Sequence, residues 1–124
     1  YRRRELSKMY REKLSDIDGL EIPYKNNYGS SSHHIFPVFL DKNIDRHNFM
    51  KHLKDKGIQT SIHYPPIHQF EFYQRNFDNK EGVLPLTEDI AKREVSLPLY
   101  PSMGDEDVTY VCDIAIEYLK KGRY

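Results

Sequence analysis

Two histidines in one short stretch, His63 and His68, are the residues whose type and spacing come nearest to a reactive site. Imidazoles bind metals, exchange hydrogen bonds and move protons near neutral pH. The pair brackets Pro65 and Pro66, and prolines favour an extended path of about 3.1 Å per residue, or roughly 15 Å over five residues. Zinc needs each ring nitrogen about 2.0–2.1 Å from one ion, so we predict no metal site here.

Two roles then remain for these imidazoles, and the sequence leaves both open. In the first, both rings satisfy backbone groups in a tight turn at the prolines. In the second, at least one ring points into a ligand site at the end of a strand. Tyr64 lies between the two histidines and adds a third polar ring to the same stretch.

Other reactive signatures are missing from the sequence. No glycine-rich phosphate loop, Walker motif or Gly-x-Ser-x-Gly element occurs. Cys112 is the single cysteine, which excludes a disulfide framework and favours a reducing, cytoplasmic setting. It lies on an apolar stripe of the last expected helix, so we predict a buried structural thiol rather than a nucleophile.

The composition is that of a soluble globular domain. The 124 residues suffice for one core, and 19 basic residues balance 19 acidic ones. That balance provides no overall field to attract nucleic acid or an anionic membrane. No apolar run approaches the roughly 20 residues of a membrane span, and no signal peptide is visible. The chain opens inside a helix without a Met or a cap, so we expect a fragment of a longer protein.

The elements that must position these side chains follow from hydrophobic periodicity. Helices are expected over Tyr1–Ile17, ending at Asp18-Gly19; from Asn43 or Asp45 to Gly57; from the N-cap Thr87; and from Gly104-Asp105 onward. Strands are expected over Leu20–Pro23, His33–Leu40, Ile58–Tyr64 and Val95–Tyr100. The segment Phe70–Phe77 fits either a short helix or a loop cluster. Pro37 and Pro98 lack an amide proton, so Pro37 favours an edge position or a bulge, and Pro98 favours an edge or the end of its strand.

This order of elements predicts an α+β fold, in which a small, three- to four-stranded, mostly antiparallel sheet has helices packed on one face. We expect residues 1–124 to form a single domain. The last helix carries two apolar stripes, one with Val108, Val111, Cys112, Ala115 and Leu119 and one with Tyr110, Ile114 and Tyr118. A helix that is apolar on two sides packs between layers or against another domain.

Three segments stand out by their order and spacing. They are Gly57-Ile-Gln-Thr-Ser-Ile-His-Tyr-Pro-Pro-Ile-His68, Leu84-Pro-Leu-Thr-Glu88, and Val95-Ser-Leu-Pro-Leu-Tyr-Pro101 followed by Met103. Together they resemble the C-terminal domain of the DegT/DnrJ/EryC1/StrS family of pyridoxal-phosphate-dependent sugar aminotransferases. His34, before an aliphatic-aromatic pair, resembles the start of that domain's first strand. The resemblance extends over essentially the whole chain.

The resemblance implies a fold-type I aminotransferase that transfers an amino group, usually from glutamate, to a nucleotide-linked keto-sugar with pyridoxal phosphate as cofactor. In that family the Schiff-base lysine lies in a large N-terminal domain, which we expect to be absent here. No lysine of this chain has an apolar, pocket-like sequence context. The chain alone is therefore expected to bind no cofactor and to be inactive. The full-length protein is expected to be a homodimer in the cytoplasm.

By the same resemblance, the loop from His63 to His68 closes over the sugar as one wall of the active site. His63 and His68 are candidates to hydrogen-bond the hexose or the nucleotide, and Tyr64 to stack on it or to donate a hydrogen bond. His34 is a further substrate-binding candidate. No catalytic residue, cofactor ligand or metal ligand is predicted within this chain.

Two alternatives remain open at this point. A branch of the same family uses the fold and the cofactor for dehydration of the sugar, and the residue that replaces the lysine lies outside this chain. The other alternative is a stand-alone, non-catalytic module that binds a sugar or a protein. The two-sided last helix favours a missing packing partner over a self-sufficient module.

Overall fold

The computed structural model describes residues 1–25, 30–77 and 81–121. Its helices are α1 (Arg2–Leu14), α2 (Arg46–Asp55), α3 (Glu71–Asn76), α4 (Pro85–Arg93) and α5 (Asp105–Lys121), with a 3-10 turn η1 (Ile67–Gln69). Its strands are β1 (Leu20–Glu21), β2 (Phe36–Leu40) and β3 (Glu94–Leu97). Within these residues, no helix is long and apolar enough to cross a membrane.

The three strands form one antiparallel sheet in the order β1-β2-β3. β2 pairs with β3 from Phe36 opposite Leu97 to Phe39 opposite Glu94. β1 pairs only with the last two residues of β2. Together with the helices, this sheet confirms the predicted α+β class.

Both strand prolines limit the pairing of the sheet. β3 is an edge strand, as Pro98 predicts, and it ends at Leu97 directly before the proline. β2 is the central strand, so the prediction that Pro37 marks an edge is wrong for the strand as a whole. Pro37 nevertheless lies beyond β1, whose partners are Phe39 and Leu40, and has a described strand neighbour on one side only.

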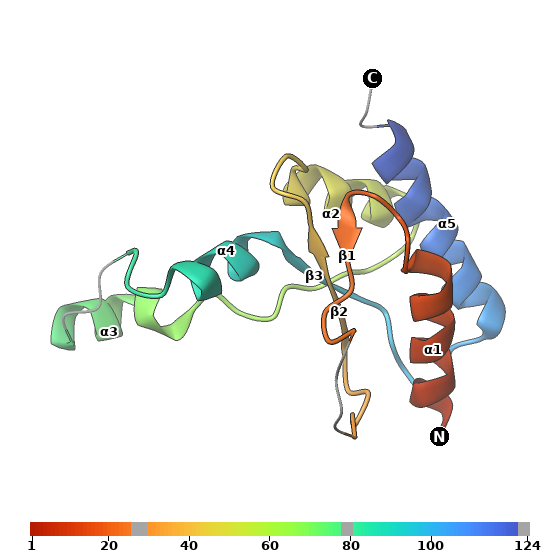
Figure 1. Ribbon diagram of the computed structural model, residues 1–124, viewed down its shortest axis with the longest axis horizontal. Coiled ribbons are helices and arrows are strands. Elements are labelled where there is room, and N and C mark those ends of the chain that lie inside the picture. The colour runs from red at the N-terminus through yellow and green to blue at the C-terminus, as the bar shows by residue number, and fades with distance from the viewer. Residues whose placement is uncertain (26–29, 78–80, 122–124) are drawn as a thin grey trace.

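Helices α1, α2 and α5 cover one face of the sheet, with α1 and α5 side by side (Figure 1). The side chains of β2 alternate between the two faces of the sheet, which explains why the helices cover one face. Phe36, Val38 and Leu40 are buried, and the residues between them are half-buried. Tyr10 of α1 stacks on Phe36 with ring centroids 4.7 Å apart. Cys112 of α5 is also buried in this core, and burial raises the pKa of its thiol to about 12.

Two capping features limit α2 where the sequence predicts them. Asp45 is the N-cap, and its carboxylate accepts a hydrogen bond of 2.7 Å from the Asn48 amide. At the other end Gly57 takes a positive φ of 78°, which a glycine adopts without steric cost. The Ile58 amide then reaches back to the Leu53 carbonyl at 2.9 Å and closes the helix.

Two other predicted helix boundaries are wrong. α1 ends at Leu14, and Gly19 lies in the turn into β1 with φ 89° rather than at the helix end. α4 starts at Pro85, so Thr87 lies inside the helix and does not cap it. Proline suits the first helical position because the amide that it lacks would have no partner there.

The predicted strand over Ile58–Tyr64 does not form. Ser61 and Ser96 make a single antiparallel bridge beside β3, through amide-to-carbonyl bonds of 2.8 and 3.2 Å. Beyond the bridge, the His63 amide donates to the side-chain carboxylate of Glu94 instead of to a backbone carbonyl. The next residue takes a positive φ of 55° and two prolines follow, so strand pairing stops there.

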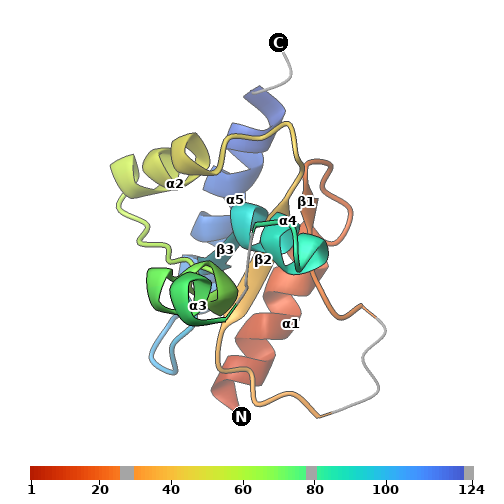
Figure 2. The ribbon, with the colours of Figure 1, turned by 90° about the vertical axis from the view of Figure 1, so that its left-hand side faces the viewer.

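The elements η1, α3 and α4 form an arm that extends away from α1 and α5 (Figure 1), and Figure 2 shows α3 and α4 in front of the sheet. The segment Phe70–Phe77 is largely helical, one of the two outcomes that the sequence allows. No residue of α3 is buried. Large apolar side chains of the arm are instead exposed; they are Ile67, Phe70, Phe72, Tyr73, Phe77, Val83, Leu84 and Leu86.

Candidate functional site

A groove beside β3 holds two of the predicted substrate-binding residues. This sheet groove has a volume of about 710 Å³ and lies between the segment 57–63 and the first turns of α5. His34 and His63 both line it, although they are far apart in the sequence. Tyr100, Asp107 and Tyr110 add polar groups to its wall.

A second groove, the arm groove, holds the other two candidates and shares His63 with the first. Its volume is about 770 Å³, and it lies between the proline segment and α4. Tyr64 and His68 line it, together with the apolar side chains of Leu84 and Ile90. His63 therefore lies at the junction of the two grooves.

A chain of polar contacts to β3 holds His63 at this junction. Its Nδ1 lies 2.8 Å from the hydroxyl oxygen of Ser96, and that hydroxyl donates a bond of 2.7 Å to the Glu94 carboxylate. The second carboxylate oxygen of Glu94 accepts the backbone N–H of His63 at 2.8 Å. Glu94 and Ser96 are buried, whereas 38% of the His63 side chain is exposed. The ring is fixed along one edge and open to solvent on the other.

His68 is buried and bonded to an acidic side chain of the arm. Its Nε2 lies 2.9 Å from the carboxylate of Glu88, which also accepts hydrogen bonds from the amides of Gly82 and Leu84. The hydrogen bond with His68, helped by the two amides and opposed by burial, holds the pKa of Glu88 below its usual range. His68 is thus held inside the arm by Glu88, and only 8% of its side chain is exposed.

The two roles that the sequence leaves open for the histidines can now be compared. Among the described residues, the ring nitrogens of His63 and His68 bind side chains and not backbone groups. The prediction that both rings satisfy the backbone of a tight turn is therefore wrong. His63 fits the second role by its position at the groove junction, and its contact with a ligand stays a prediction.

Tyr64 and His34 are open to solvent. Tyr64 is 78% exposed, and its ring meets that of His63 edge-on with centroids 6.0 Å apart. Its positive φ of 55° is unfavourable for a residue other than glycine, with a cost of about 1–3 kcal/mol. Such conformations cluster at functional sites, which agrees with a ligand-facing place for this ring.

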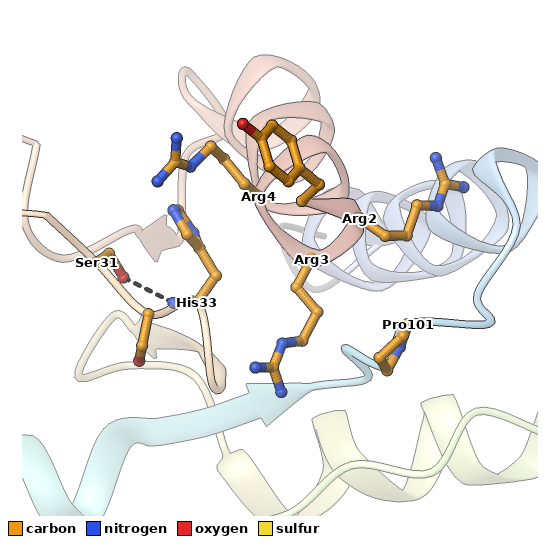
Figure 3. A pocket seen from close by; sticks show the side chains of 8 residues that line it. Arg2, Arg3, Arg4, Ser31, His33 and Pro101 are labelled. Carbon is orange, nitrogen blue, oxygen red and sulfur yellow. Dashed lines mark hydrogen bonds between the residues drawn. The ribbon is translucent and has the colours of Figure 1, made fainter.

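A third hollow, of about 440 Å³, opens at the first turn of α1 (Figure 3). Arg2 is one of its lining residues, but the Arg2 guanidinium points outward and pairs with Asp105 at 2.6 Å. Arg3 and Arg4 have no carboxylate partner among the described residues. Burial and the nearby arginines, Arg4 foremost, lower the pKa of His33. None of the four predicted substrate-binding residues lines this hollow.

The grooves do not offer the side chains of a metal or cofactor centre. In the described part of the chain, no group of three His, Cys, Asp or Glu residues could hold a metal ion. Every lysine that the structure describes is exposed, and none lines the sheet groove or the arm groove. Pyridoxal phosphate needs a lysine for its Schiff base, so these residues do not fit that cofactor.

The sequence prediction missed the three residues that hold the histidines, Glu94, Ser96 and Glu88. Glu94 and Ser96 are two positions apart on a strand, so their side chains lie on the same face. Two polar residues at that spacing in an apolar strand were a usable signal, but the predicted strand begins one residue too late to include Glu94. Glu88 carried no signal, because an acidic residue is ordinary in the first turn of a helix.

The fold is that of a part of known aminotransferases. The aminotransferase TlmJ from Streptoalloteichus hindustanus superimposes with a TM-score of 0.85 at 32% identity, over 97% of this chain and 31% of that one. The spore coat polysaccharide biosynthesis protein SpsC of Bacillus subtilis is 34% identical over 96% of this chain and 32% of its own length. The dTDP-4-dehydro-2,3,6-trideoxy-D-glucose 4-aminotransferase of Saccharopolyspora spinosa is 36% identical over 90% of this chain and 28% of its own.

The sequence profile of the DegT/DnrJ/EryC1/StrS aminotransferase family matches residues 1–115. The chain belongs to this family, which confirms the resemblance carried by its three sequence segments. It spans about a third of the length of these relatives, between 28% and 32%. The similarity therefore concerns one portion of each relative.

Proposed function

We propose that residues 1–124 are the small C-terminal domain of a pyridoxal-phosphate-dependent aminotransferase that acts on a nucleotide-linked keto-sugar, in amino-sugar or polysaccharide biosynthesis. The two grooves that meet at His63 form one wall of the substrate site. The lysine and the phosphate-binding groups belong to a large N-terminal domain outside this chain. The observation that carries the proposal is the groove junction, which gathers His34, His63 and Tyr64 but no lysine.

The lining of the junction suits a sugar. Sugar hydroxyls both donate and accept hydrogen bonds, and imidazole and phenol groups can do the same. The exposed ring of Tyr64 offers a flat apolar surface beside them. The names of two relatives support this substrate class, since one specifies a dTDP-linked dehydro-sugar and the other polysaccharide biosynthesis.

The exposed apolar side chains of the arm support a larger assembly. Phe72 is 65% and Leu86 72% exposed, and the neighbouring exposed rings of Phe70 and Phe77 extend this surface. Apolar patches of this kind mark contact surfaces in soluble proteins. In this proposal the patch is covered by the large N-terminal domain and by a second copy of the protein in a homodimer. The protein is located in the cytoplasm, where the thiol of Cys112 stays reduced.

The proposal is tested with the full-length protein loaded with pyridoxal phosphate. It is incubated with glutamate and with dTDP- or UDP-linked 4-keto hexoses, and the products are read by mass spectrometry. The expected product carries an amine in place of the keto oxygen. Loss of water without gain of nitrogen would identify the dehydrating branch of the family. A protein that neither reacts nor binds the cofactor would be a non-catalytic binding module.

The isolated chain of 124 residues serves as the control. Because its described lysines are all exposed, we expect no specific aldimine absorption when pyridoxal phosphate is added. A stoichiometric adduct at one lysine, trapped with borohydride, would contradict the proposed division of labour between the domains.

A further inference from the structure

We propose that Glu94 and Ser96 are positioning residues that fix His63 as a hydrogen-bond acceptor toward a hydroxyl group of the sugar. The tautomer of the ring rests on the hydrogen-bond geometry with Glu94 as an ionised carboxylate, whereas the identity of the ligand rests on the proposed function. The point at issue is one proton, which a neutral imidazole carries either on Nδ1 or on Nε2.

The proton order, meaning which group donates and which accepts in each hydrogen bond from Glu94 through Ser96 to His63, begins at Glu94. Its Oε2 receives the backbone N–H of His63 at 2.8 Å, and a backbone N–H can only donate. An ionised carboxylate accepts at both oxygens, so the hydroxyl of Ser96, 2.7 Å from Oε1, donates its proton to Glu94.

The Ser96 hydroxyl then determines the tautomer of His63. A hydroxyl has a single proton, and that proton is directed at Glu94. The oxygen of Ser96 can therefore only accept from Nδ1 of His63, which lies 2.8 Å away. Nδ1 carries the ring proton, and Nε2 keeps a free lone pair.

The free lone pair of Nε2 is available where the ligand is expected. No hydrogen bond to Nε2 of His63 is found among the described residues, and the ring lines both grooves. A sugar hydroxyl can donate to this nitrogen, whereas a keto oxygen cannot. The site therefore selects a sugar with a hydroxyl at the position facing His63 and rejects the deoxy sugar, which leaves the acceptor unpaired.

The opposite proton order makes a clear rival. If Glu94 were protonated, it would donate to Ser96, Ser96 would donate to Nδ1, and Nε2 would carry the proton and act as a donor. The tautomer of His63 separates the two orders. It is measured in the full-length holoenzyme by ¹⁵N NMR of labelled histidine or by neutron crystallography, and Nδ1–H is expected. Nε2–H in the wild-type protein would overturn the proposal.

Glu94→Gln gives the sharpest variant. The amide oxygen of the new Gln side chain must face the His63 backbone N–H, because an NH₂ group at that place would put two hydrogen-bond donors against each other. The NH₂ group then donates to Ser96, and Ser96 donates to Nδ1. We expect the tautomer of His63 to switch to Nε2–H. An unchanged tautomer in Glu94→Gln would overturn the proposal.

Ser96→Ala is a second variant in case Glu94→Gln does not fold, and Ser61→Ala is its matched control. Ser61 is the bridge partner of Ser96, and its hydroxyl makes no hydrogen bond to the described residues. Removal of the Ser96 hydroxyl is expected to leave a mixture of both tautomers. Ser61→Ala is expected to keep Nδ1–H, and a mixture there as well would overturn the role of Ser96.

The ligand half of the proposal is tested with dTDP-glucose as a binding probe and with the keto-sugar as substrate. In Glu94→Gln we expect affinity for dTDP-glucose to fall by up to about tenfold and KM to rise by as much, while kcat changes little. The reason is that the sugar hydroxyl must reverse its hydrogen bond and accept from Nε2–H instead of donating to Nε2. A switched tautomer with unchanged affinity and KM would overturn the acceptor role. A wild-type enzyme that aminates no keto-sugar, with the tautomers as expected, would overturn the proposed function and support the fixed ring.

Discussion

The helical body and the arm of this chain are held together in different ways. In the body, which we define as α1, α2, α5 and the sheet, fully buried side chains such as Tyr10, Phe49 and Val38 form one apolar core. In the arm, the large apolar side chains are exposed, and the buried contact is the polar pair of His68 and Glu88. The body is therefore held by its own apolar core, whereas the arm exposes the apolar surface that the proposed function assigns to a partner.

The candidate site lies at the boundary between these two regions. His63 is anchored on the body side, because its partners Glu94 and Ser96 belong to β3. Tyr64, the next residue, lies beyond the sheet and lines the arm groove. The candidate site thus combines a ring bonded to the sheet with a ring that is 78% exposed to solvent.

The largest expected effect is a loss of stability in the body. Phe49 is fully buried and meets the ring of Tyr118 edge-on, with centroids 5.4 Å apart. Phe49→Ala is expected to lower the free energy of unfolding of the chain by about 3–5 kcal/mol, measured by urea denaturation. Phe72→Ala in the arm is the matched control, with a change within about 0.5 kcal/mol. Equal losses in both variants would remove the distinction between body and arm.

A smaller effect is expected from the helix caps. Asp45→Ala removes the side chain that accepts the Asn48 amide and is expected to cost about 1 kcal/mol of stability. Thr87→Ala in the arm is the control, because Thr87 lies inside α4 and does not cap it. The same denaturation measurement applies, and a comparable loss for Thr87→Ala would show that the start of α4 is wrongly assigned.

Acid is expected to open the arm and leave the body closed. In the folded arm, the hydrogen bond between His68 and Glu88 holds the pKa of Glu88 below the unfolded value of about 4.3. The stabilisation is therefore fully present above the unfolded pKa and is lost as pH falls through the folded pKa. We expect the amides of Gly82 and Leu84 to lose hydrogen-exchange protection over this range.

Two variants control the acid experiment. Glu88→Gln is expected to abolish the pH dependence of protection at Gly82 and Leu84. Glu81→Gln, at an exposed residue paired with Lys92, is expected to preserve it. Loss of protection in α1 and α5 at the same pH would show that the arm and the body open together.

The smallest effect on this chain is expected at the arm surface. Leu86 is 72% exposed, so Leu86→Ser is expected to leave the unfolding free energy of the chain within about 0.5 kcal/mol. In the full-length protein, the same change is expected to weaken packing or dimerisation, measured by sedimentation velocity. An unchanged assembly would count against a covered arm.

Local chemistry explains what the sequence determined by itself. The ends of α2 were predictable because Asp45 and Gly57 act on amides and carbonyls within a few residues. The burial of alternate residues in β2 follows from the period of a strand. The family was also recognisable, because it depends on the order of short motifs and needs no contact between them.

Tertiary structure alone decided how the site is held. The partners of His63 lie 31 and 33 residues away in the sequence, and that of His68 lies 20 away. One of these contacts also explains why the predicted strand at 58–64 does not form. The His63 amide donates to the side-chain carboxylate of Glu94 and not to the backbone of a neighbouring strand. A hydrogen bond is determined by distance and direction in space, and a pattern along one segment contains neither.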